Sequence, residues 1–78
     1  MPKIIVYSTQ FCPWCVKLKE FLNKNKVAYE ERMVDKEPKF AEELENKSGQ
    51  LGVPVSDVEG TIIIGFNEPA LRKALRLS

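Results

Sequence analysis

The two cysteines of this 78-residue chain lie within one short segment, in which residues 12–15 read Cys-Pro-Trp-Cys. A short run of mostly β-branched residues precedes the segment and predicts a buried strand over residues 3–7. Apolar residues with helical spacing follow it and predict a helix from Pro13 to about Asn25. Proline favours that start, because its missing N–H would have no intrahelical partner. The cysteine pair therefore marks the point where a strand passes into a helix.

The next part of the chain predicts a second strand and a second helix. Residues 27–34 alternate imperfectly between apolar and polar side chains, which indicates a strand. Two strands joined by a helix of this length form a right-handed βαβ unit, with the strands parallel. Pro38 is placed to begin a second helix of about ten residues, which ends at Ser-Gly-Gln, residues 48–50. Its apolar side consists of Phe40, Ala41 and Leu44.

The last third of the chain predicts two antiparallel strands and a final helix. One strand begins at Val53, and residues 61–64, Thr-Ile-Ile-Ile, form the other. The Glu59-Gly60 turn between them is too short for a parallel connection. Asn67 is placed to cap the final helix. The order βαβαββα predicts a single α/β domain over residues 1–78, with a mixed four-stranded sheet and helices on both faces.

Composition and charge argue against several classes of partner. With 44% hydrophobic and 29% charged residues, the chain has the make-up of a folded domain. The net charge of +1 gives no general attraction to nucleic acid or membranes. No apolar run approaches the roughly 20 residues that span a bilayer, and the N-terminus lacks a signal-peptide layout. We therefore expect a cytoplasmic monomer.

In the first helix Leu18, Phe21 and Leu22 should face inward, and Lys17, Lys19, Glu20, Asn23 and Lys24 should face water.

The position of the cysteine pair favours thiol–disulfide exchange, in which a thiolate is the nucleophile. Cys12 should stand at the N-cap of the first helix, where unpaired N–H groups and the positive end of the helix dipole favour a negative sulfur. Cys15 should lie about one turn further in, within reach of the Cys12 sulfur. We predict that Cys12 attacks and Cys15 resolves. Trp14 either offers an exposed apolar contact beside the sulfurs or packs on the helix.

Other uses of the cysteine pair remain open at this point. A structural zinc ion needs four ligands, whereas this chain supplies two thiolates and no histidine, so a second chain or carboxylates would be required. An iron–sulfur cluster would likewise have to be shared between two chains. A purely structural disulfide would close a very small loop and stabilise little. We favour the reading with no bound cofactor, in which Cys12 and Cys15 form a redox-active disulfide.

Three parts of the sequence, in order, resemble the glutaredoxin family of the thioredoxin fold. They are the Cys-Pro-Trp-Cys segment after a strand, Val53-Pro54 at the start of a later strand, and residues 65–67, Gly-Phe-Asn, before the last helix. The resemblance implies a thioredoxin-like fold and a thiol–disulfide oxidoreductase. It also implies a cis peptide bond before Pro54, opposite the Cys12 sulfur, and a backbone there that pairs with the substrate. The substrate-binding residues would be Pro13, Trp14, Val53, Pro54, Gly65 and Phe66.

Two branches of this family differ in their reductant. Glutathione-dependent glutaredoxins usually carry a basic residue before the first cysteine, a Thr-Val-Pro segment and a Gly-Gly-acidic turn. This chain has Thr-Gln-Phe at residues 9–11, Gly-Val before Pro54, and Gly-Phe-Asn at residues 65–67. The candidates to replace the missing contacts to the glutathione carboxylates are Lys17, Lys36 and Lys39.

The other branch consists of glutaredoxin-like redoxins that a thioredoxin-reductase flavoenzyme reduces, and some of them donate electrons to ribonucleotide reductase. These redoxins commonly show a single Gly-Phe with a nearby proline, as residues 65–69 do here. Their cysteine motif often has other middle residues, so Pro13 and Trp14 depart towards the glutaredoxin pattern. We expect protein disulfides as substrates and a thioredoxin reductase as reductant, with glutathione as the alternative reductant.

Overall fold

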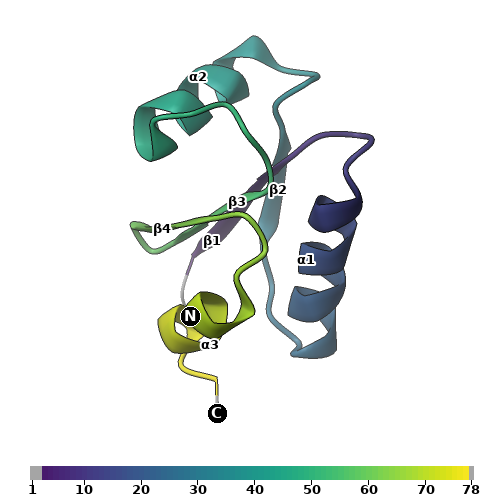
Figure 1. The fold of residues 1–78 in the computed structure, drawn as a ribbon, viewed down its shortest axis with the longest axis vertical. Helices are drawn as coiled ribbons and strands as arrows, with labels where there is room; N and C mark the ends of the chain where they lie inside the picture. Colours follow the sequence, from purple (N-terminus) through teal and green to yellow (C-terminus); the bar gives the residue numbers. More distant parts are fainter. Residues whose placement is uncertain (1–2, 78) are drawn as a thin grey trace.

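The computed structural model describes residues 3–77 and has the predicted order of elements, βαβαββα (Figure 1). The elements are β1 (Ile4–Ser8), α1 (Pro13–Lys24), β2 (Glu30–Met33), α2 (Pro38–Ser48), β3 (Val55–Val58), β4 (Thr61–Ile64) and α3 (Glu68–Leu75). The strands form one sheet in the order β2-β1-β3-β4. β1 is parallel to β2 and antiparallel to β3, which is antiparallel to β4, so the predicted mixed sheet is confirmed.

Two strands begin at least two residues later than the sequence predicted, each for a local reason. The N–H of Val27 donates to the carbonyl of Leu22 at 2.9 Å, so this residue closes the end of α1, and β2 begins at Glu30. Pro54 has no N–H to donate to a neighbouring strand, and β3 begins one residue after it. The predicted cap of α3 is confirmed, because Asn67 Oδ1 accepts a hydrogen bond from the N–H of Ala70 at 3.2 Å.

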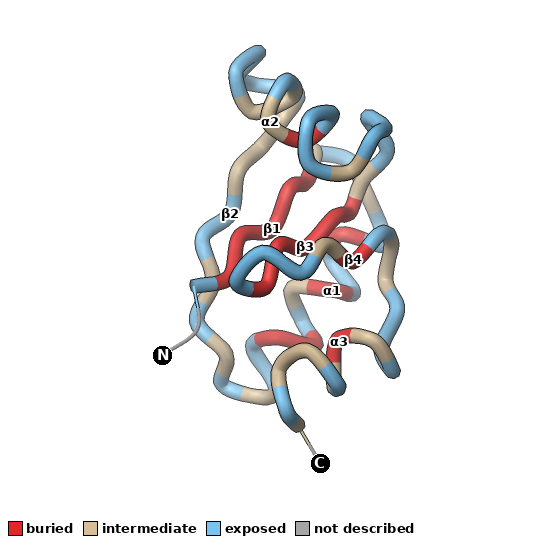
Figure 2. Tube along the Cα trace, turned by 90° about the vertical axis from the view of Figure 1, so that its left-hand side faces the viewer, coloured by how far each residue is buried: buried red, intermediate tan, exposed pale blue. Residues whose placement is uncertain are grey.

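The helices cover both faces of the sheet, as predicted. In Figure 1, α2 lies on one face, while α1 and α3 lie on the other. β1 is a central strand and is buried on both sides, so its side chains divide between two cores. Ile4 and Val6 pack with the α1 and α3 leucines, whereas Ile5 and Tyr7 pack with Leu44 of α2. Figure 2 shows these buried residues concentrated along β1, β3 and the inner sides of the helices.

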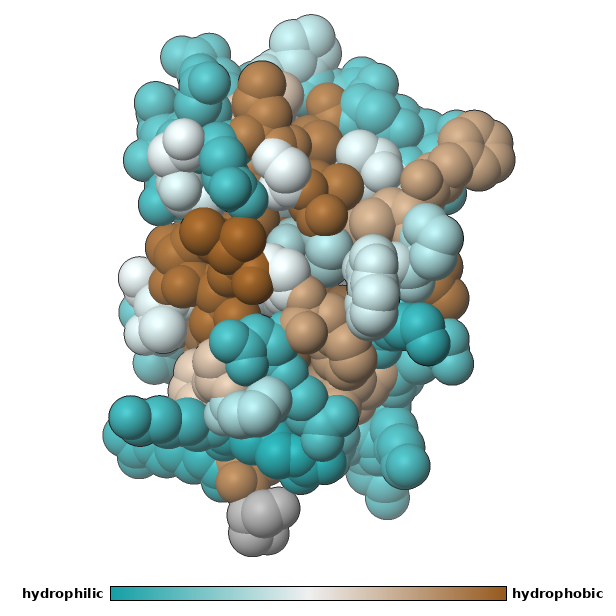
Figure 3. Space-filling model, in the orientation of Figure 1, coloured by the Kyte–Doolittle hydropathy of each residue, from teal (hydrophilic) through white to brown (hydrophobic). Residues whose placement is uncertain are grey.

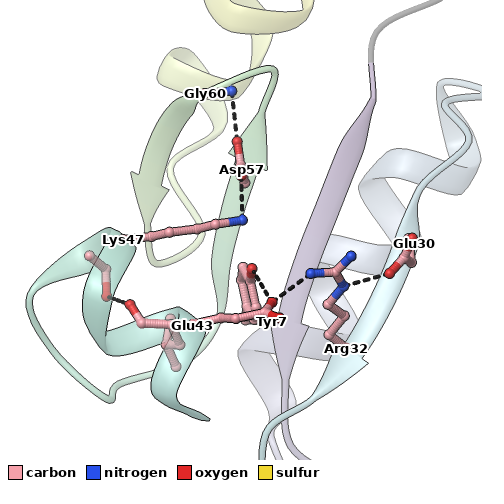
Figure 4. Close-up of polar contacts among 9 residues, drawn as sticks. Tyr7, Glu30, Arg32, Glu43, Lys47, Asp57 and Gly60 are labelled. Carbon is pink, nitrogen blue, oxygen red and sulfur yellow. Dashed lines mark hydrogen bonds and ion pairs between the residues drawn. The ribbon is translucent and has the colours of Figure 1, made fainter. Parts of the chain in front are cut away.

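Polar contacts supplement a single buried leucine in fixing α2 to the sheet. Leu44 is the buried residue of this helix. Glu43 of α2 accepts hydrogen bonds from the Tyr7 hydroxyl at 3.1 Å and from Nη1 of Arg32 at 2.5 Å (Figure 4). Arg32 also pairs with Glu30 on the same strand. α2 is thereby connected to both β1 and β2.

A second polar contact connects α2 to β3. Lys47 Nζ lies 2.8 Å from Asp57 Oδ2, and the N–H of Gly60 donates to Asp57 Oδ1 at 2.7 Å (Figure 4). Burial alone would raise the pKa of Asp57, but the contacts with Lys47 and the Gly60 N–H outweigh it and hold the pKa below its ordinary value. The same carboxylate therefore positions both α2 and the turn between β3 and β4.

Within residues 3–77, none of the helices combines the length and the apolar character that crossing a bilayer requires.

Candidate redox site

The structure places Cys12 at the N-cap of α1, as the sequence predicted. Its backbone is extended, with φ −140° and ψ 101°, and its Sγ accepts a hydrogen bond from the N–H of Cys15 at 3.2 Å. The Cys12 carbonyl accepts the next hydrogen bond of the helix, from Val16 at 3.1 Å. The sulfur thus occupies the place of an N-cap oxygen, at the positive end of the helix dipole.

Cys15 lies one turn further along α1 and is only 1% exposed, whereas Cys12 is partly exposed. Burial, together with a side-chain hydrogen bond to Cys12, raises the pKa of the Cys15 thiol to about 12. At neutral pH this thiol keeps its proton. Both cysteines are free thiols in the structure. The pair therefore offers one sulfur that a substrate can reach and a second, protected sulfur beside it.

Two large aromatic side chains close to Cys12 in the sequence are exposed. Trp14 is 58% exposed, which agrees with the exposed alternative, and Lys17 Nζ lies 5.8 Å from the centre of its ring. Phe11, directly before Cys12, is 89% exposed and was not among the predicted site residues. The sequence feature that could have identified it is an aromatic residue in a polar loop, outside the apolar pattern of any predicted strand or helix. Figure 3 shows apolar surface over β4 and above it.

Five of the predicted substrate-binding residues gather at one pocket of about 260 Å³. The loop before β3 and the loop after β4 meet there, because the N–H of Gly65 donates to the carbonyl of Pro54 at 2.8 Å. Gly65 has φ 76°, in the left-handed region that favours glycine. The predicted cis bond between Val53 and Pro54 is present. The lining residues are Trp14, Val53, Pro54, Gly65 and Phe66.

Phe66 fixes this pocket to the helix that carries the cysteines. Its ring meets that of Phe21 edge to face, with the ring centres 5.9 Å apart. Pro13, the sixth predicted substrate-binding residue, is the exposed first residue of α1 and does not line the pocket. The structure therefore brings five of the six predicted residues together.

The lysines considered for glutathione binding are spread over the surface. Lys17 lies beside Trp14, whereas Lys39 is on α2 with its Nζ 5.5 Å from the ring of Phe40. Lys36 is exposed in the turn before α2. None of the three lines the pocket of Trp14 and Pro54. Among residues 3–77, no three histidine, cysteine or acidic side chains gather in a group that could hold a metal ion.

Lys19 faces water only in part, which the sequence did not predict. Its ammonium group lies 2.8 Å from Oε2 of Glu31 on β2, and its side chain is 27% exposed. The helical spacing alone could not show this contact, because the partner belongs to the neighbouring strand. The other four residues assigned to the polar face of α1, Lys17, Glu20, Asn23 and Lys24, are exposed as predicted.

Comparisons with known proteins agree on one family. Residues 4–63 match the family described as glutaredoxin. A glutaredoxin-like protein of the rubredoxin operon of Clostridium pasteurianum is 40% identical over 72 residues, which cover 92% of this chain and 96% of that protein. The glutaredoxin of Pseudomonas aeruginosa is 32% identical over 78 residues, covering 99% of this chain and 93% of its own. The crystal structure of a glutaredoxin from Archaeoglobus fulgidus has a TM-score of 0.88 and 30% identity, covering 97% and 88% of the two chains.

Proposed function

This chain belongs to the glutaredoxin family, whose thiol oxidoreductases use a cysteine redox centre in a thioredoxin-like fold, and we propose that it reduces disulfide bonds in proteins. We further propose that a flavoprotein of the thioredoxin-reductase type restores its dithiol. The observation that supports the proposal best is the contrast between the two sulfurs, one reachable at the N-cap and one 1% exposed beside it.

The proposed reaction has two exchange steps. The Cys12 thiolate attacks one sulfur of the substrate disulfide, a Cys12–substrate disulfide forms, and the first substrate thiolate leaves. Cys15 then loses its proton to solvent and attacks Cys12 Sγ, which releases the second substrate thiolate. The substrate gains two electrons and the chain is left with a Cys12–Cys15 disulfide. The reductase returns two electrons, and two protons complete the cycle.

The pocket lined by Trp14 and Pro54 supports a protein as the reductant. Its lining residues carry no charged side chain, whereas glutathione presents two carboxylates and an ammonium group. Burying those charges without partners is unfavourable. An apolar, partly aromatic surface suits the exposed backbone and apolar side chains of another protein. Glutathione remains the second candidate because Lys17 lies beside Trp14, which lines this pocket.

We expect faster reduction of the disulfide form by a thioredoxin reductase than by glutathione. With insulin as substrate, NADPH consumption through a bacterial thioredoxin reductase should exceed that through glutathione and glutathione reductase by about tenfold or more, equivalent to ~1.4 kcal/mol. The reason is the lack of charged partners for glutathione in the pocket lining. Both assays use the same preparation and the same insulin concentration.

A variant of Lys17 provides the control for this comparison. If Lys17 binds a glutathione carboxylate, Lys17→Gln should raise the KM for glutathione severalfold and leave insulin reduction with dithiothreitol unchanged. Rapid turnover with glutathione, combined with none from thioredoxin reductases, would assign the chain to the glutathione-dependent branch. Failure to reduce insulin under any of these conditions would remove the proposed function altogether.

A further inference from the structure

A polar cluster lies between α1 and the sheet, on the side where Cys15 is buried. Oε2 of Glu31 accepts one hydrogen bond from the Ser8 hydroxyl at 2.7 Å and another from Lys19 Nζ at 2.8 Å. Ser8 ends β1 and is fully buried. Val6, two residues earlier on β1, packs with leucines of α1, and alternation along the strand places Ser8 on this same side. The cluster thus joins α1, β1 and β2 at the end of β1 that leads to Cys12.

The cluster brings a positive charge to the buried cysteine. Lys19 follows Cys15 by four residues on α1, so the two side chains are neighbours on one face of the helix. Burial is the main influence on the pKa of the Cys15 thiol and raises it, whereas a hydrogen bond with the Thr9 backbone and, more weakly, the Lys19 charge lower it. The hydrogen bond from Lys19 to Glu31 raises the pKa of the ammonium group, so this charge is present throughout the neutral range.

We propose that Lys19 favours the thiolate form of Cys15 during the resolving step, and that Glu31 and Ser8 are the positioning residues that hold Lys19 there. This inference rests on the proposed function, because it concerns the second exchange step. No activity or binding role had been assigned to these three side chains from the sequence. They supply the second exchange step with a fixed cation about one helical turn along α1 from the sulfur that must become negative inside the protein.

A positive charge favours the resolving step because Cys15 must lose its proton and become negative before it attacks Cys12 Sγ. Once Cys12 is part of the mixed disulfide, its sulfur is neutral and no longer opposes ionisation of Cys15. The Cys15 proton then passes to solvent, the new Cys15–Cys12 bond forms, and the Cys12–substrate bond breaks. The chain has no histidine to act as a base, and the step is favoured by the two contacts that stabilise the thiolate, the Thr9 backbone hydrogen bond and the Lys19 charge. Besides Glu31 and Cys15, the ionisable side chain that acts on Lys19 is Tyr29.

Stopped-flow reaction of the reduced protein with dithiobis(nitrobenzoate) separates the two steps. This aromatic disulfide releases one coloured thiolate when Cys12 attacks and a second when Cys15 resolves the adduct. In Lys19→Gln we expect the second release to slow by about fivefold at pH 7, as expected for losing one nearby charge. Its pH midpoint should move upward, while the first release stays within about twofold of the wild-type rate.

Three further variants distinguish the charge of Lys19 from its packing. Lys19→Arg keeps the charge and should restore most of the second-phase rate, whereas Lys19→Met keeps only the apolar stem and should behave like Lys19→Gln. Lys24→Gln removes an exposed lysine of the same helix and should change neither phase. An unchanged second-phase rate and pH midpoint in folded Lys19→Gln and Lys19→Met would overturn the inference. Absence of both releases in the wild type would instead overturn the proposed function.

Discussion

The Cys12→Ser variant should lose insulin reduction by about 1,000-fold or more, equivalent to ~4 kcal/mol of lost transition-state stabilisation. A serine hydroxyl cannot form the covalent intermediate, and the buried Cys15 cannot take over the attack because it is 1% exposed. The measurement is the initial rate of insulin reduction with dithiothreitol as the electron donor, compared with the uncatalysed rate.

The same substitution should leave the fold intact, which makes the loss interpretable. Serine is among the best N-cap residues, and its hydroxyl can accept the hydrogen bond that the Cys15 N–H now donates to Cys12 Sγ. The thermal midpoint of Cys12→Ser should therefore match or exceed that of the wild type. A variant that unfolds no earlier and still reduces insulin at more than about a tenth of the wild-type rate would refute the role assigned to Cys12.

The Cys15→Ser variant should stop after the first exchange step and accumulate a mixed disulfide. The attacking sulfur remains, but nothing inside the protein releases the bound substrate thiol. Incubation with a disulfide-containing protein substrate should convert most of the variant into a covalent adduct, which a non-reducing gel would show. Dithiothreitol should cleave that adduct by reducing its disulfide bond.

The control for trapping is Cys12→Ser in the same incubation. It retains only the buried cysteine and should give no adduct. Equal adduct formation by the two variants would mean that the order of the two cysteines has been assigned wrongly.

Because a hydroxyl at position 15 replaces a buried thiol, the Cys15→Ser protein should also lose about 1–3 kcal/mol of stability, which chemical denaturation would detect.

Local sequence signals predicted most of the fold and the centre of the site. Proline at the start of α1 and asparagine at the start of α3 act within a few residues of their own positions, and both helices begin where those signals place them. The Glu59-Gly60 turn is also local: both residues have positive φ, as a type I′ hairpin turn requires. Cys12 and Cys15 could be located because their chemistry depends on helix geometry that a four-residue segment defines.

Features that depend on contacts between distant segments were not predictable in the same way. Val27 looked like a strand residue, but its N–H completes the end of α1. Lys19 looked like one more solvated lysine, and only the register of β2 beside β1 shows that Glu31 is its partner. The contacts of Tyr7 with Glu43 span 36 positions of the chain. No pattern within one element predicts which charged residues of another element lie opposite it.

The difference between the two sulfurs is the feature on which the proposed function most depends, and brief alkylation of the reduced wild-type protein measures this difference directly. Limiting iodoacetamide at pH 7, followed by fragment-ion mass spectrometry, gives the extent of labelling at each cysteine. We predict that Cys12 is labelled at least about 100-fold faster than Cys15, because thiolate character and exposure govern the rate and Cys15 is buried with a pKa raised to about 12. Equal labelling of the two cysteines, or faster labelling of Cys15, would contradict the account.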